Sequence, residues 1–263
     1  MIIEERQIRI LQILKEKQFI SVNELVEQLH ASRSSIIRDL NALEKQGRLT
    51  RQRGGASLLS SEAIIHGMID PTVFEKESVN VKKKQDICAW VAQKIQKGQC
   101  IYVDSGSTTR YLLPYLVDKQ VTLVTPSVFL LRNLPDDFQG EVFLLGGRFD
   151  ARYDMSTGPL SQQMLKQFRF DISFMTANGL NADNHEIYSA DFGLGSIKAE
   201  VLKRSQQSIL LVDDSKFSIS AICQWATMED FDLIVTNVYP KKKKPKNVME
   251  TEGEKNENNQ SKK

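Results

Sequence analysis

The chain contains little cysteine, histidine or tryptophan. It has three cysteines, three histidines and two tryptophans in 263 residues. The cysteines form no CxxC pair, and with so few histidines they give no spacing typical of a metal site. We therefore expect reduced, buried cysteines and neither a metal nor a cofactor.

Long apolar runs and a strong net charge are also missing. No segment approaches the roughly 20 apolar residues of a membrane span, and the charged N-terminus lacks the apolar stretch of a signal peptide. The net charge is only +2. We expect a cytoplasmic protein without membrane contact, in which any strong positive field is local.

Two short helices separated by a tight turn are predicted over residues 21–45. The first begins with a capping box, because Ser21 is followed three residues later by Glu24, and Ser32 can cap the second. Apolar residues at helical spacing give each helix a buried face: Val22, Leu25, Val26 and Leu29 on the first, and Ile36, Leu40 and Leu43 on the second. An earlier helix over residues 4–17 supplies a third wall of this small core.

The opposite face of the second helix and a basic hairpin after it are suited to bind DNA. Residues 49–53 can form the wing of a winged helix, and six Lys/Arg against two Asp/Glu between residues 33 and 53 give a local charge of +4. The side chains placed to reach phosphates or base edges are Ser32, Arg33, Ser34, Ser35, Ile37, Arg38, Asn41, Arg51 and Arg53. We predict a winged helix-turn-helix domain over residues 1–57, with its helix-turn-helix at about 20–39. A helical hairpin that binds protein and an ordinary solvated charged face are the alternatives.

A second domain is predicted over residues 81–240, after a linker at 58–80. A helix over 82–97 is followed by short apolar runs, suited to strands buried on both faces, that alternate with helical segments. The expected strands are 100–103, 121–124, 142–145, 172–175, 208–212 and 233–235, and the expected crossover helices are 109–116, 128–133, 161–168 and 194–205. The fold class is therefore α/β. Residues 241–263 are charged and nearly without apolar side chains, so we expect a disordered tail.

Three loops at the expected carboxyl ends of these strands carry residues suited to hold an anion. In D-S-G-S-T-T at 104–109, backbone N–H groups and hydroxyls could surround a phosphate, although helix capping explains this turn equally well. No lysine follows in the Walker pattern, which argues against a nucleoside triphosphate site. The other loops are G-G-R-F at 146–149 and D-D-S-K-F at 213–217; Lys216 in the latter is a natural cation for the anion, but a solvated lysine would look identical.

Residues 32–56 resemble the signature of the DeoR family of bacterial sugar-operon repressors. That signature usually reads S-x-x-T-[IV]-R-R-D-L-x-x-L-x-x-x-G-x-[IL]-x-R-x-x-G-G-A, and this chain departs from it at Ser35, in place of Thr, and at Ile37, in place of an arginine. Similarity to the family's sensor domain continues through D-S-G-S-T-T at 104–109, T-P-S at 125–127, L-L-G-G-R at 144–148, A-N-G-L at 177–180, Lys198, and D-D-S-K-F at 213–217.

The resemblance implies a C-terminal sensor domain that is similar to ribose-5-phosphate isomerase and binds a phosphorylated sugar effector. Together with the three loops, it indicates the effector-binding residues Asp104, Ser105, Gly106, Ser107, Thr108, Thr109, Gly146, Gly147, Arg148, Gly179, Lys198 and Lys216. The acidic residues common before the lysine matched by Lys198 are absent here. Candidate substitutes for contacts with sugar hydroxyls are Glu186, Tyr188 and Asp191, whereas His185 is expected to be exposed.

Two classes of function fit these features. In the first, a homo-oligomeric transcriptional regulator, most directly a repressor of a carbohydrate-utilisation operon, binds a double-stranded DNA operator with an affinity that the sugar phosphate modulates. In the second, the sheet domain is a sugar-phosphate isomerase or deaminase that the winged helix tethers to DNA. An isomerase needs a positioned general base, and no carboxylate and histidine constellation stands out, so we predict no catalytic residues and favour the regulator.

Overall fold

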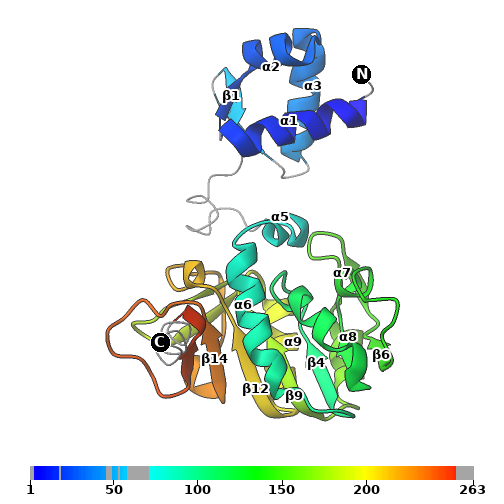
Figure 1. The fold of residues 1–263 in the computed structure, drawn as a ribbon, viewed down its shortest axis with the longest axis vertical. Helices are drawn as coiled ribbons and strands as arrows, with labels where there is room; N and C mark the ends of the chain where they lie inside the picture. The colour runs from blue at the N-terminus through cyan, green and yellow to red at the C-terminus, as the bar shows by residue number, and fades with distance from the viewer. Residues whose placement is uncertain (1–2, 18, 46–48, 53, 58–70, 253–263) are drawn as a thin grey trace, which may run out of the picture. The chain divides into compact units, whose positions relative to one another are not determined.

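The computed structural model describes residues 3–17, 19–45, 49–52, 54–57 and 71–252 (Figure 1). The chain divides into two units, Met1–Pro71 and Thr72–Lys263, which we call the headpiece and the sensor unit. The headpiece buries one apolar cluster and the sensor unit buries two. Among the described helices, none is both long enough and apolar enough to cross a lipid bilayer.

The described residues of the headpiece form three helices and a small antiparallel sheet. The helices are α1 (Ile3–Lys17), α2 (Val22–Leu29) and α3 (Arg33–Lys45), and the strands lie in the order β1 (Phe19–Ser21), β3 (Gly55–Ser57), β2 (Thr50–Gln52). The expected caps are present, since the Glu24 N–H donates to Ser21 Oγ at 3.2 Å and the Ser35 N–H donates to Ser32 Oγ at 3.2 Å. The three predicted helices and the hairpin wing are therefore confirmed.

A partly buried ion pair joins α3 to α1. Asp39 on α3 is 3% exposed, and its Oδ2 accepts a hydrogen bond from Arg6 Nε at 2.5 Å. Gln7 Nε2 donates to the other carboxylate oxygen at 3.4 Å. Asp39, which belongs to the quoted family signature, thus fixes α3 from its buried side.

The sensor unit is built on a seven-stranded sheet in which each pair of neighbours is parallel. The strand order is β15-β14-β12-β9-β4-β5-β6. The strands are β4 (Cys100–Val103), β5 (Thr122–Thr125), β6 (Glu141–Leu144), β9 (Phe170–Met175), β12 (Ser205–Leu211), β14 (Leu233–Thr236) and β15 (Val248–Glu250). All six predicted strands are present, which confirms the α/β class.

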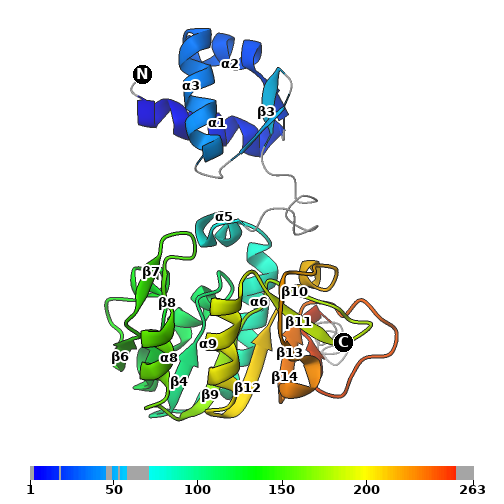
Figure 2. The ribbon, with the colours of Figure 1, turned by 180° about the vertical axis from the view of Figure 1, so that it is seen from behind.

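Helices cover both faces of this sheet (Figure 1, Figure 2). One face packs against α6 (Val81–Val91), η2 (Thr109–Tyr115) and α7 (Val128–Leu131), and the other packs against α8 (Pro159–Leu165) and α9 (Phe192–Leu202). Other helical segments in the described part of the sensor unit are α5 (Val73–Glu77), η1 (Ala92–Lys94), η3 (Val117–Lys119), η4 (Asp214–Lys216) and η5 (Met228–Asp230). In β4, Ile101 and Val103 enter one apolar cluster and Tyr102 enters the other, as expected for a strand buried on both faces.

Two small antiparallel sheets were not predicted. β7 (Arg148–Asp150) pairs with β8 (Met155–Thr157), and β11 (Glu186–Ser189) lies between β10 (Gly179–Leu180) and β13 (Cys223–Thr227). The pairing of β11 with β13 joins Glu186 to Thr227 at one end and Ser189 to Cys223 at the other, and periodicity within one segment does not reveal such distant partners.

The predicted linker at 58–80 and the predicted tail at 241–263 are each wrong in part. Thr72 and Glu75 form a capping box that starts α5 inside the sensor unit. At the other end, β15 pairs with β14, and Val248 is only 4% exposed, so the residues around it belong to the sheet. Residues 58–70 and 253–263 of these two predictions lie outside the described residues.

Candidate nucleic-acid interface and effector pocket

The exposed face of α3 carries most of the residues predicted to contact DNA. The exposed members are Ser32, Arg33, Ser34, Arg38 and Asn41, while Ser35, Ile37 and Arg51 are half-buried. Arg38 reaches back over its own helix, where its Nε donates to Ser34 O at 3.4 Å. Arg53 lies outside the described residues, so its role stays a prediction.

Arginine side chains also fix the elements that flank this face. Arg33 Nη1 donates to Asn23 Oδ1 of α2 at 2.6 Å, which joins the two helices of the motif. From β2, Arg51 Nη1 donates to Asn41 Oδ1 at 2.6 Å, and the Arg51 backbone N–H donates to Glu44 Oε1 at 2.8 Å. These bonds hold the wing against α3.

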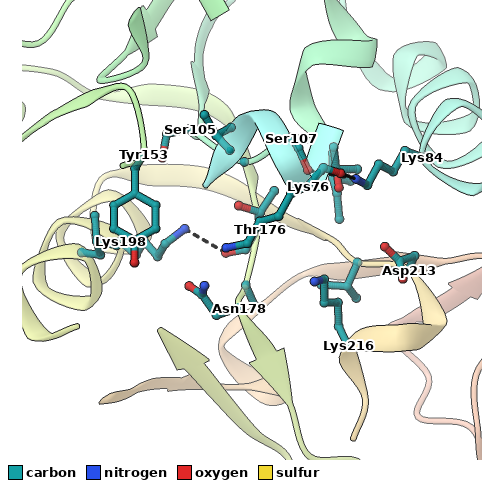
Figure 3. A pocket seen from close by; sticks show the side chains of 17 residues that line it. Lys76, Lys84, Ser105, Ser107, Tyr153, Thr176, Asn178, Lys198, Asp213 and Lys216 are labelled. Atoms are coloured by element: carbon teal, nitrogen blue, oxygen red, sulfur yellow. Dashed lines mark hydrogen bonds between the residues drawn. The ribbon is translucent and has the colours of Figure 1, made fainter. Parts of the chain in front are cut away.

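A pocket opens at the carboxyl ends of β4, β9 and β12 (Figure 3). It encloses about 630 Å³ of empty space, its open mouth included, and its wall draws on α5, α6, α9 and the segments that follow the three strands. Of the predicted effector residues, it brings together Ser105, Gly106, Ser107, Thr108, Lys198 and Lys216.

The loop after β4 presents free backbone donors to this pocket. Within the described part of the chain, the N–H groups of Gly106, Ser107 and Thr108 form no hydrogen bond. Thr109 supports the loop from behind, since its Oγ1 donates to Asp104 O at 2.7 Å and to Gly106 O at 2.6 Å. Successive free N–H groups of this kind form a concave site for an anion.

Asp104 and Lys198 form a buried ion pair beside the pocket. They are 1% and 6% exposed, and Lys198 Nζ donates to Asp104 Oδ2 and, at 2.9 Å, to Thr176 O. The same carboxylate oxygen accepts bonds from the Thr176 N–H at 2.9 Å and from Thr176 Oγ1 at 2.7 Å. The pair therefore joins the loops after β4 and β9, and it leaves little net charge for a ligand.

Lys84 is a pocket cation that was not predicted. It is 3% exposed, and its Nζ donates to Ser107 Oγ at 2.9 Å and to Lys76 O. Burial lowers the pKa of the Lys84 ammonium to about 8, an effect that Asp213 opposes and that the positive charges of Lys216 and Lys76 increase.

The apolar spacing in α6 is a sequence signal that indicates burial of Lys84. Lys84 lies three, four and seven residues before Ile87, Cys88 and Val91, so it occupies the buried stripe of α6. The other pocket residues that were not among the predicted effector-binding residues are Val73, Lys76, Tyr153, Thr176, Ala177, Asn178, Leu194, Leu211, Val212 and Asp213. They come from separate elements that meet only in the tertiary structure.

Cations outnumber carboxylates around the pocket. Besides Lys198, which is paired with Asp104, the lysines Lys76, Lys84 and Lys216 line the pocket, against one lining carboxylate, Asp213. Among the described residues, the Lys216 ammonium forms no hydrogen bond. Asp213 Oδ1 is already occupied, because it accepts a bond from Asn80 Nδ2 at 3.0 Å. The arrangement favours an anionic ligand.

Four glycine and arginine positions predicted to bind the effector do not border the pocket, which corrects that part of the prediction. A Cβ on Gly147 would lie 2.6 Å from Thr157 O, and one on Gly179 would lie 2.0 Å from Ile219 O, so both glycines permit close backbone packing. Gly146 O accepts a bond from Ser161 Oγ at 2.6 Å, and Arg148 is exposed on β7.

The suggested substitutes for sugar contacts also lie outside the pocket lining. Asp191 caps α9 by accepting from the Leu194 N–H at 2.9 Å, and Tyr188 donates its hydroxyl hydrogen bond to Glu186 Oε2. His185 pairs with Glu229 at 2.5 Å, away from the residues that form the pocket wall.

A winged helix-turn-helix unit and a parallel α/β unit with a cationic pocket, in one chain, define the class of two-domain DNA-binding regulators. Residues 6–62 match the DeoR-like helix-turn-helix domain, and residues 79–238 match the DeoR C terminal sensor domain. The chain belongs to the DeoR family of helix-turn-helix transcriptional regulators.

Relatives of nearly the full length support this assignment. The chain is 30% identical over 240 residues to the uncharacterized HTH-type transcriptional regulator FruR of Bacillus subtilis, covering 90% of this chain and 92% of that protein. It is 31% identical over 232 residues to the lactose phosphotransferase system repressor of Lactococcus lactis subsp. lactis, covering 87% and 89% of the two chains. Ribose 5-phosphate isomerase A from Methanocaldococcus jannaschii aligns with 15% identity and a TM-score of 0.39 over 52% of this chain and 55% of the enzyme, a likeness too small to support an argument about function.

Proposed function

We propose that the protein is a repressor of a carbohydrate-utilisation operon, and that a phosphorylated sugar bound in the pocket modulates its affinity for operator DNA. The observation that carries this proposal is the combination of lysines and free backbone N–H groups in one pocket. The relative described as a lactose phosphotransferase system repressor supports the link to sugar metabolism.

The phosphate group would lie between the loop after β4 and the lysines that face it. The N–H groups of Gly106, Ser107 and Thr108 can donate to its oxygens, and Lys84 and Lys216 supply positive charge. Charge-assisted hydrogen bonds of this kind are about twice as strong as neutral ones. Asn178 and Tyr153, on the remaining wall, would face the sugar.

A binding role explains the pocket better than catalysis does. Asp104 is committed to Lys198 and Thr176, and Asp213 accepts a bond from Asn80, so neither carboxylate is placed as a free general base. We therefore propose that the protein senses its ligand without converting it.

Titration of the purified full chain with sugar phosphates tests the proposal. A labelled DNA fragment from upstream of its own gene should bind, and one phosphorylated sugar in a panel should change the affinity while its unphosphorylated counterpart does not. Lys216→Met should shift this response to higher ligand concentration and leave DNA binding intact. Turnover of the active sugar phosphate, followed by NMR, would favour the enzyme instead, and no preference for the promoter fragment would refute the proposal.

Arg38→Ala is expected to weaken operator binding by about 1–3 kcal/mol and to relax the preference at one base pair, if the guanidinium meets a base edge. Fluorescence anisotropy with single-base operator variants measures both effects. Arg169→Ala, an exposed arginine of the sensor unit, is the control and should leave binding unchanged. Equal weakening on all sequences would assign Arg38 to a phosphate contact.

Effector affinity is expected to fall as the pH rises through about 8, the pKa of Lys84. The phosphate dianion binds the ammonium form, so binding above this pH requires proton uptake and loses at most about tenfold in affinity per pH unit. Below about pH 6 the phosphate itself takes up a proton and affinity should fall again. Calorimetry across this range tests the profile, which should be flat on the alkaline side in Lys84→Met; a flat wild-type profile would contradict the role of Lys84.

A homo-oligomer is also expected on DNA. One recognition helix reads few base pairs, so a complete operator needs two half-sites and a symmetric protein. Light scattering of the complex should give at least two chains per operator, and a single bound chain would contradict this expectation.

A further inference from the structure

α5 forms part of the pocket and is also the first element of the sensor unit along the chain. Val73 and Lys76 of this helix line the pocket. The headpiece ends at Pro71, two residues before α5 begins at Val73. A ligand that contacts α5 would therefore contact the part of the sensor unit that directly follows the headpiece in the chain.

The end of α5 is held by a pocket cation. Lys84 Nζ donates to Lys76 O and to Ser107 Oγ, so one buried ammonium links α5 to the anion-binding loop (Figure 3). Residues of η2 also hold this end of α5, because Tyr111 Oη donates to Glu77 O at 3.3 Å and Arg110 pairs with the Glu77 carboxylate. The Lys84 side chain therefore connects α5 directly to the loop that lines the pocket.

We propose that α5 transmits the occupancy of the pocket to the headpiece. A bound phosphate contacts both Lys84 and the Lys76 side chain and thereby fixes α5 against the loop at 105–108. The inference rests on the proposed function in requiring that the pocket binds a phosphate group. It adds that the segment leading to the headpiece is itself one wall of the site.

The bonding capacity of Lys84 permits this coupling. An ammonium has three N–H donors, and two are used by Ser107 Oγ and Lys76 O, so a phosphate oxygen can take the third without displacing α5. The groups that face Lys84 are Asp213, Lys216, Lys76 and Cys88. Because its pKa is depressed to about 8, a dianion beside it stabilises the charged form, and the charged form is the stronger donor to the α5 carbonyl.

Hydrogen exchange of the full chain in potassium phosphate tests the proposal, with potassium chloride of equal ionic strength as the reference. At a phosphate concentration ten times its Kd, amides of residues 73–79 and 105–108 should exchange roughly tenfold more slowly, since binding reduces the open population by 1 + [L]/Kd. Lys76→Met, measured at ten times its own Kd, should keep the protection of 105–108 and lose that of 73–79. The matched control is Lys82→Met, whose side chain on α6 is 77% exposed and which should behave as wild type.

The outcomes separate this inference from the proposed function. Protection of 105–108 without protection of 73–79 in the wild-type protein would overturn the role of α5 and leave the phosphate site standing. Protection of neither segment would overturn both. The sugar phosphate that changes operator affinity of the wild type then tests transmission: Lys76→Met should still bind it in calorimetry and fail to respond on DNA, and a full response at saturation would overturn the inference.

Discussion

Lys198→Met is expected to lower the free energy of unfolding of the sensor unit by about 3–5 kcal/mol, because it leaves the carboxylate of Asp104 buried without its cation. Asp104 is 1% exposed and would keep only the two bonds from Thr176 and its interaction with the Ser105 N–H. Urea unfolding followed by tryptophan fluorescence measures this, since Trp90 and Trp225, the two tryptophans of the chain, both belong to the sensor unit.

The cause of the loss can be separated from a general effect of removing a lysine. Lys203→Met, at an exposed position on the end of the same helix, should change stability by no more than about 0.5 kcal/mol. The double variant Asp104→Asn, Lys198→Met removes both charges, keeps an oxygen acceptor for Thr176 and should recover part of the loss. A loss below about 1 kcal/mol in Lys198→Met would mean that the pair is solvated, as surface pairs are.

Leu40→Ala is expected to cost the headpiece about 2–5 kcal/mol and, with it, operator binding. Leu40 is completely buried in the cluster formed by the three helices and the wing. A unit of this size has little stability to lose, because small domains bury a smaller fraction of their surface than large ones. Helical circular dichroism should decrease, and the affinity for operator DNA should fall with the fraction of folded headpiece.

The sensor unit provides the internal control for Leu40→Ala. Its tryptophan-detected unfolding midpoint should stay unchanged, because the substitution lies in the other unit. Ile8→Ala, on the exposed side of α1 at 54% exposure, should retain both helix content and DNA binding. Normal operator affinity in Leu40→Ala would contradict the assignment of this residue to the headpiece core.

Sequence patterns predicted the repeating elements well and their long-range partners poorly. Helical spacing and capping residues located α2 and α3, and short apolar runs located six strands of the parallel sheet. The expected helix at 109–116 became a 3-10 helix that contains Pro114, a residue without an N–H for the helical bond. β15 was not predicted, because its short apolar stretch lies in a charged segment. Its pairing with β14 is what stabilises it.

For the candidate site, local motifs indicate most where one loop supplies the pocket lining. The glycine and hydroxyl pattern at 104–109 lies in a loop whose residues 105–108 line the pocket, while anion binding there stays a prediction. The motif at 146–148 instead serves the turn into β7, because the local pattern of a ligand loop and that of a tight turn are the same. Lys76 and Lys84 become pocket residues only when α5 and α6 pack beside the loop after β4.

The sequence by itself determined the winged helix-turn-helix, the parallel α/β class and the family, since these follow from residue spacing, caps and motifs that are local along the chain. Only the tertiary structure decided which charges are free to meet a ligand. Lys198 is paired with Asp104 and Asp39 with Arg6, whereas Lys84 is buried at the pocket. The physical reason is that the availability of a charge depends on its burial and on partners from distant segments, and these distances exist only after folding.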